Sequence, residues 1–388
     1  MRKSLALCLL ALSFLLPRAG DAAESGWWWN AGQSGRGFSI EVQGSSLFLA
    51  GFLYADDGRA TWLTSAGTMS NANAYEGTLL AYGNGQTLSG AYQPSTLSNP
   101  NAGAVSLQFT DATHGTLTWP GGAIAIERFV FGSGTPAFQP ATGWWWNPAE
   151  SGRGFFVEVQ GGNLFLAGYM YDAPGNPVWY VASGAMASPD LFQGHWDQYQ
   201  GGQTLTGPYL PPAAPANVGS LTLQFTSPGS ATLTLPDGRQ IPLSRFAFAA
   251  PPALVGNWSG GWANNTFGTS GSATLAASAD VVAQSFQATV DLDGSVFGMG
   301  NPAPLTFSGP YGASGADVTI ASPLFGTLAL QVSPTGQISG NATNVPGGAI
   351  LRIDFTGTWT ATTINIAYTI TFVGGGGTAT GTLALTKQ

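Results

Sequence analysis

Charged side chains that recur at matched positions are the residues of this sequence best suited to chemistry. The chain contains two copies of one long segment, and the only acids at matched positions are Glu41 and Glu158. Paired carboxylates can cleave glycosides, but each copy supplies only one. The other reading is a buried carboxylate that accepts hydrogen bonds from a nearby arginine or from indole N–H groups inside a barrel. Ligand binding is the remaining alternative.

Other catalytic chemistry finds little support in the sequence. His114 and His195 lie at non-equivalent positions, so the copies share no histidine for acid–base or metal chemistry. The run Asp291 to Ser295 begins like a calcium loop but lacks its remaining acidic ligand. No nucleophile elbow, phosphate loop or dinucleotide motif occurs. We therefore predict no catalytic residue, no metal and no cofactor, and we do not expect an enzyme.

Each copy opens with an aromatic box, Gly-Trp-Trp-Trp-Asn, at residues 26–30 and 143–147, followed by Ser-Gly-Arg-Gly-Phe. Three adjacent tryptophans are costly to leave in water, so each box either anchors a core or lines a binding surface. The run Leu47 to Tyr54 is apolar on both faces, and its second face is either covered by the tryptophan box or the adjacent repeat, or forms an aromatic platform for a sugar ring or an apolar ligand. Most aromatic stripes belong to a core. Under the binding alternative, the candidate ligand contacts are Trp27, Trp29, Glu41, Tyr54, Trp62, Trp144, Trp146, Glu158, Tyr171 and Trp179.

The elements that must position these residues are β-strands. Phe38, Ile40 and Val42 alternate with polar residues, and turn signals separate short runs of this kind. We expect an all-β fold of three units, in which each repeat is an antiparallel meander of about eight strands closed into a barrel. The predicted organisation is a signal peptide at 1–23, repeat units at 25–131 and 142–248, and a barrel-like unit at 254–388.

The two ends of each unit resemble the signature of calycins, the lipocalin and avidin barrels. Each unit starts with Gly-x-Trp and ends with a basic residue, and the resemblance implies that this residue packs on the first-strand tryptophan and closes the barrel. The repeated boxes also resemble an uncharacterised module of exported proteobacterial proteins. The residues expected to be structural are Trp28, Arg36, Arg128, Trp145, Arg153, Arg245, Trp258 and Lys387.

Composition favours an exported protein. Arg2 and Lys3 precede an apolar run and small residues, as in a secretory signal, and the run is too short to span a bilayer. The single cysteine, Cys8, lies in that signal, so disulfides are not expected. The net charge of −8 disfavours nucleic acid. We predict a non-catalytic protein, secreted, periplasmic or at the cell surface, without a transmembrane segment, that binds a glycan, a small apolar molecule or an envelope component. A structural or envelope-interaction protein is the alternative, and a secreted hydrolase is the least favoured.

Overall fold

The protein consists of three closed antiparallel β-barrels, of eight, eight and ten strands. The computed structural model describes residues 23–296, 300–312 and 315–388. The predicted all-β class and the eight-stranded meander of each repeat are therefore confirmed. Residues 1–22 of the predicted signal peptide, Cys8 among them, lie outside the described residues.

Within both repeats each strand pairs with the next along the chain. The strands of the first barrel are β1 (Gly26–Trp29), β2 (Gly37–Gln43), β3 (Ser46–Tyr54), β4 (Ala60–Thr68), β5 (Ala74–Gly83), β6 (Thr96–Phe109), β7 (His114–Trp119) and β8 (Gly122–Arg128). Those of the second are β9 (Gly143–Trp146), β10 (Gly154–Gln160), β11 (Asn163–Tyr171), β12 (Pro177–Ala185), β13 (Leu191–Gln198), β14 (Ala216–Ser227), β15 (Ser230–Thr234) and β16 (Gln240–Arg245).

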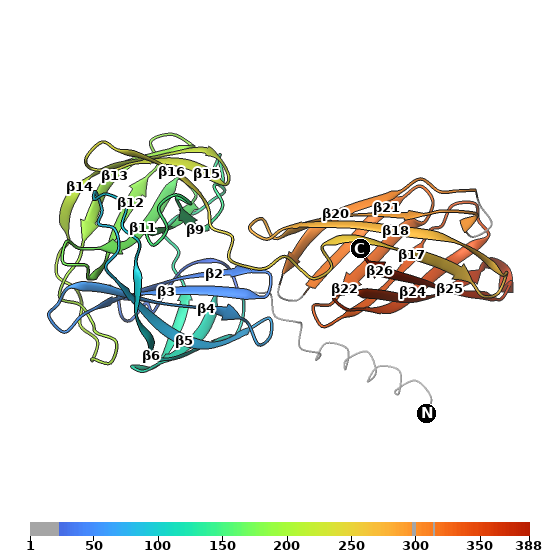
Figure 1. Ribbon diagram of the computed structural model, residues 1–388, viewed down its shortest axis with the longest axis horizontal. Helices are drawn as coiled ribbons and strands as arrows, with labels where there is room; N and C mark the ends of the chain where they lie inside the picture. The colour runs from blue at the N-terminus through green and yellow to red at the C-terminus, as the bar shows by residue number, and fades with distance from the viewer. Residues whose placement is uncertain (1–22, 297–299, 313–314) are drawn as a thin grey trace, which may run out of the picture.

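The third barrel has longer and more numerous strands. They are β17 (Gly256–Asn264), β18 (Thr269–Asp280), β19 (Ser285–Leu292), β20 (Leu305–Gly312), β21 (Gly315–Ser322), β22 (Gly326–Val332), β23 (Gln337–Thr343), β24 (Ile350–Trp359), β25 (Thr363–Phe372) and β26 (Thr378–Lys387), with the short 3-10 turn η2 (Val373–Gly375) before β26. In Figure 1 the two repeats lie against each other, and the third barrel extends away from them.

The same contact, between a first-strand tryptophan and a final basic residue, closes all three barrels. The first-strand tryptophan stands opposite the final basic residue in the register, as Trp28 does to Arg128 and Trp258 to Lys387. In each barrel the cation lies 5.3 to 6.0 Å from the centre of the indole ring, and in the second barrel the pair is Trp145 and Arg245. This is the contact that the first-strand tryptophan and final basic residue were expected to make.

The indole of that tryptophan is fixed as well. Its N–H donates to the backbone carbonyl four residues earlier in each unit, over 3.1 Å from Trp28 to Glu24 and 2.9 Å from Trp258 to Leu254. The glycine of Gly-x-Trp has a positive φ, and a Cβ at Gly26 would overlap the Arg128 guanidinium. The box is therefore a structural motif that needs glycine, tryptophan and a cation together.

Candidate functional site

The two repeats are joined by a reciprocal pair of buried ion pairs. Glu158 of the second repeat accepts from Arg128 of the first over 2.5 Å and from the backbone N–H of Trp27 over 2.9 Å. In the mirrored arrangement, Glu41 of the first repeat pairs with Arg245 of the second. Each arginine therefore caps its own barrel and also holds the neighbouring barrel.

Glu41 is almost fully enclosed, with 2% of its surface exposed. Besides Arg245, it accepts from the backbone N–H of Trp144 and from the side-chain amide of Gln43, each over 2.7 Å. Burial raises the pKa of the Glu41 carboxyl above its ordinary value, while Arg245 and these hydrogen bonds oppose the rise. The carboxyl is thus held as the centre of a structural network.

The location of these carboxylates differs from the sequence-based expectation. Glu41 was expected to find its partner inside its own barrel, yet Phe38 and Ile40 fill that interior. The opposite face of β2 is turned toward the second repeat, where Arg245 lies. Period-two alternation separates the two faces of a strand correctly, but the polar face that carries Glu41 is covered by the second repeat rather than lying inside its own barrel.

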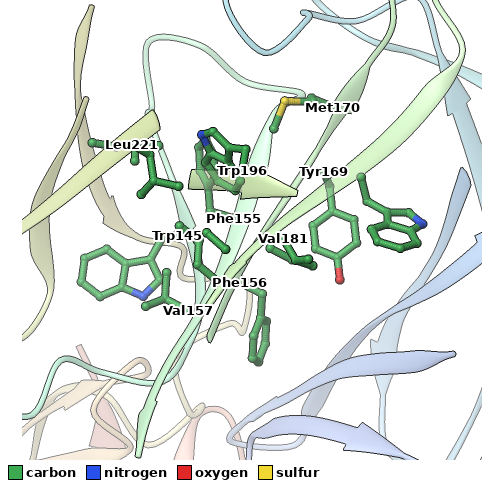
Figure 2. Close-up of a cluster of buried hydrophobic side chains, with 14 of the residues drawn as sticks. Trp145, Phe155, Phe156, Val157, Tyr169, Met170, Val181, Trp196 and Leu221 are labelled. Atoms are coloured by element: carbon green, nitrogen blue, oxygen red, sulfur yellow. The ribbon is translucent and has the colours of Figure 1, made fainter. Parts of the chain in front are cut away.

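Aromatic side chains fill the rest of this junction. Trp27 lies 4.7 Å, centre to centre, from Phe156, and Phe52 stacks on Tyr169 at 5.6 Å. Figure 2 shows Phe156 and Tyr169 beside the interior residues of the second barrel. The indoles also bond across the junction, because Trp62 donates to Met170 O over 3.2 Å and Trp179 to Leu53 O over 3.1 Å. The junction is therefore a second core between the repeats.

The proposed ligand contacts fall mostly in this junction core. Trp29 and Trp146 are only half-buried, and each packs edge-on against a phenylalanine, Phe129 at 4.9 Å and Phe246 at 5.0 Å. A small hollow of about 180 Å³ includes Trp146 in its lining, together with Trp62, Trp144 and Tyr171. Ligand contact by the whole predicted set stays a prediction. Fully buried members of the set are Trp27, Glu41, Tyr54, Trp62, Trp144, Glu158, Tyr171 and Trp179.

The interiors of the first two barrels are filled by large side chains. Trp28 and Phe38 occupy the first, and Trp145, Phe155 and Trp196 occupy the second, all with 1% or less of their surface exposed. Figure 2 shows the second set in place. Arg153, expected to be structural, pairs with Glu150 and donates to Leu88 O of the first repeat over 3.1 Å. Arg36 is equally buried.

The third barrel is hollow. Its interior contains a cavity of about 590 Å³. Apolar side chains form most of the wall, with little polar surface. Barrel width grows with strand number, so ten strands leave more room than eight, and small residues such as Ala277, Ala288 and Ala342 do not fill it. Larger wall residues include Leu275, Val290, Leu330, Phe355, Ile366 and Leu383.

One end of this cavity lies beside the first repeat. Residues 44–46, which form the β2–β3 turn and the start of β3, contribute to the lining together with the linker residues 250–255. The side-chain amide of Gln284 donates to Val42 O, which ties the third barrel to that turn. The first repeat is thereby in contact with this end of the cavity.

This cavity was not predicted from the sequence. The candidate residues were mostly tryptophans and charges of the repeats, whereas the cavity wall is made of aliphatic and aromatic residues of the third unit, such as Leu275, Phe355 and Trp359. A usable signal was present in the third unit, where alanine recurs at strand positions and the Gly-Arg-Gly-Phe box is absent. Small inward residues in a long meander indicate space, but only when the strand number is known.

Among the described residues there is no cluster of three or more histidine, cysteine, aspartate or glutamate side chains that could hold a metal ion. His114 bonds to the neighbouring Asp111 on the surface, and His195 lies near Asp197. In the same described part of the chain, no helix is long and apolar enough to cross a membrane.

No family model and no curated protein matches this chain. Three solved structures are similar over most of its length. A protein of unknown function of the DUF3598 family from Nostoc punctiforme is 11% identical, with a TM-score of 0.27, over 81% of this chain and 96% of its own. A putative outer membrane protein of Bacteroides fragilis is 9% identical, with a TM-score of 0.22, over the same two shares. A transferrin binding protein B mutant from Haemophilus parasuis is 9% identical, with a TM-score of 0.19, over 90% and 86%. At these scores the likenesses carry no inference about function.

Proposed function

We propose that this protein is a non-catalytic carrier or receptor that encloses a small apolar molecule in its third barrel. The observation that supports this most is the apolar cavity of about 590 Å³. Small-molecule sites in proteins have volumes of roughly 300 to 1,000 Å³ and mostly apolar walls. The two repeats, whose interiors are filled, offer no comparable space.

The chemistry of the wall defines the ligand class. An apolar wall offers few hydrogen-bond partners, so a polar group buried there would lose its water without replacement. An aliphatic or aromatic molecule loses nothing of this kind and gains about 25 cal/mol for each Å² of apolar surface removed from water. The proposed ligand is therefore a lipid-like or aromatic molecule rather than a glycan.

A role outside the cytoplasm is part of this proposal. It is supported by the predicted signal at residues 1–23 and by a chain that reaches its stability through burial and buried ion pairs, without cysteine chemistry in the predicted mature part. In that setting the repeats would act as a rigid body that holds the third barrel.

A fluorescence titration with N-phenyl-1-naphthylamine tests the proposal. Ala288 lines the cavity and is buried, so Ala288→Trp should occupy the space and weaken probe binding at least tenfold. The neighbouring Gln287 is exposed, and Gln287→Trp serves as a matched control that should bind like the wild type. Equal binding by all three proteins, or no saturable binding by the wild type, would refute a ligand in this cavity.

A structural or envelope-interaction role for the repeats is the second candidate. The filled interiors and the aromatic junction favour it, because such surfaces serve folding. If this role alone is correct, a chain with an intact junction should show no saturable uptake of apolar probes. Saturable uptake that Ala288→Trp abolishes would exclude a purely structural function.

A further inference from the structure

Arg36 is a buried cation with no carboxylate partner. Only 4% of its surface is exposed. Among the described residues it belongs to no ion pair, whereas its counterpart in the second repeat, Arg153, pairs with Glu150. Burying an unpaired charge is costly, and desolvation lowers the pKa of Arg36. The two repeats thus differ in how this buried arginine is compensated, because Arg153 has a carboxylate partner and Arg36 does not.

The difference comes from individual substitutions between the repeats. Gln33 stands where the second repeat has Glu150, and its amide oxygen accepts from Arg36 Nη2. Near Arg153, Arg239 disfavours the charged form and Asp237 favours it, and Asp237 is matched by Gly121 in the first repeat. The first repeat has therefore kept the arginine and lost both acids around it.

Two N–H donors at this position have no acceptor in the protein. Nε of Arg36 and the indole Nε1 of Trp119 are both buried without a hydrogen-bond partner among the described residues. The guanidinium of Arg36 lies over the face of the Trp119 ring, with its carbon 5.3 Å from the ring centre. The second repeat has Leu235 in place of Trp119 and so lacks the second donor. At this position, the first repeat therefore has a positive charge and two unpaired donors, whereas the second repeat has Arg153 paired with Glu150.

We propose that Arg36 and Trp119 bind the carboxylate of a small acidic molecule, such as a uronic acid. A carboxylate offers two acceptor oxygens and one negative charge, which match a guanidinium with an unpaired Nε–H and the unpaired indole N–H of the residue on which it stacks. Glu150 in the second repeat provides the internal precedent for a carboxylate on this arginine. One cation matches a monoanion better than a doubly charged phosphate.

The site lies beneath a surface turn at the border of the repeats. Ser34 and Gly35 are exposed, and Arg36 follows directly beneath them. Tyr209 of the second repeat is 38% exposed, and its hydroxyl donates to Ser34 O over 3.1 Å. Binding of a small acid to the guanidinium therefore requires this turn and the Gln33 amide to be displaced. The site is separate from the cavity of the third barrel.

Titration of the full chain with glucuronate, with glucose as the neutral match, tests this proposal. The readout is the indole N–H resonance of Trp119 in ¹⁵N-labelled protein, assigned with Trp119→Phe. Glucuronate should shift this resonance saturably, and glucose should not. The same shift with glucose, or no shift with either sugar, would overturn the proposal.

The decisive variant is Gln33→Glu, which copies the second repeat. It should place a carboxylate on Arg36, raise the melting temperature and weaken glucuronate binding at least tenfold, while apolar probe binding in the third barrel stays unchanged. Arg36→Gln should also lose glucuronate binding. If Gln33→Glu is folded by circular dichroism and binds glucuronate as well as the wild type, the site is not where we place it.

Discussion

Neutralising Glu41 should loosen the junction between the repeats. In Glu41→Gln the shape is kept, but Arg245 stays buried and loses its counter-charge. Removing one partner of a buried pair costs about 3 to 5 kcal/mol. Burial raises the pKa of Glu41, so part of the attraction between Glu41 and Arg245 only offsets the cost of desolvating the carboxylate. We therefore expect the free energy of unfolding to fall by about 3 kcal/mol, the lower end of that range.

Urea unfolding followed by tryptophan fluorescence measures this loss. Glu76 lies on an exposed position of β5, so Glu76→Gln is the matched control and should change stability by less than about 0.5 kcal/mol. A double-mutant cycle with Arg245→Met should give a coupling energy of at least about 1 kcal/mol. If Glu41→Gln is as mild as the control, or the two substitutions are additive, the ion pair does not hold the junction.

Two further predictions concern the junction. Gly143→Ala would place a Cβ against the Glu41 carboxylate in a backbone of positive φ, so unfolding stability should fall by at least about 2 kcal/mol, whereas Gly162→Ala, with nothing within 4 Å, should be near neutral in the same urea assay. Burial raises the pKa of Tyr171 to about 12. The contribution of the protonated Tyr171 hydroxyl to the free energy of unfolding is complete below pH 10. It declines by about 1.4 kcal/mol for each pH unit as the pH rises toward 12, because in this range only the unfolded chain releases the hydroxyl proton. Urea midpoints between pH 9 and 12 should show a shallower decline for Tyr171→Phe, and an unchanged decline would contradict the burial argument.

The sequence predicted the barrels because their causes are local. Alternation at Phe38, Ile40 and Val42 identifies a strand whatever lies beyond it, whereas closure by a tryptophan and a cation was implied by the resemblance to calycins. The partner of Glu41 could not be predicted in this way. The same alternation fits an open polar face and a face covered by another repeat, and only the assembled structure shows Arg245 arriving from the second barrel.

The third barrel illustrates the other limit. Alternating apolar residues such as Leu328, Leu330 and Val332 suit a filled barrel and a hollow one equally. The difference depends on strand number and on how the inward volumes add up across ten strands. The unpaired state of Arg36 could be predicted in part. Gln33 stands where the second repeat has Glu150, so the sequence already shows that the acid is missing. Only the structure shows that Arg36 is buried.

Binding of a homologous series of n-alkyl carboxylates to the third barrel tests the central claim most directly. Each buried methylene contributes about 0.8 kcal/mol, so Kd should fall roughly fourfold with every added carbon until the cavity is full and then level off. Ala288→Trp should move that plateau to a shorter chain, and Gln287→Trp should leave it in place. A Kd that does not depend on chain length, or a plateau that Ala288→Trp leaves unmoved, would contradict an apolar ligand inside the third barrel.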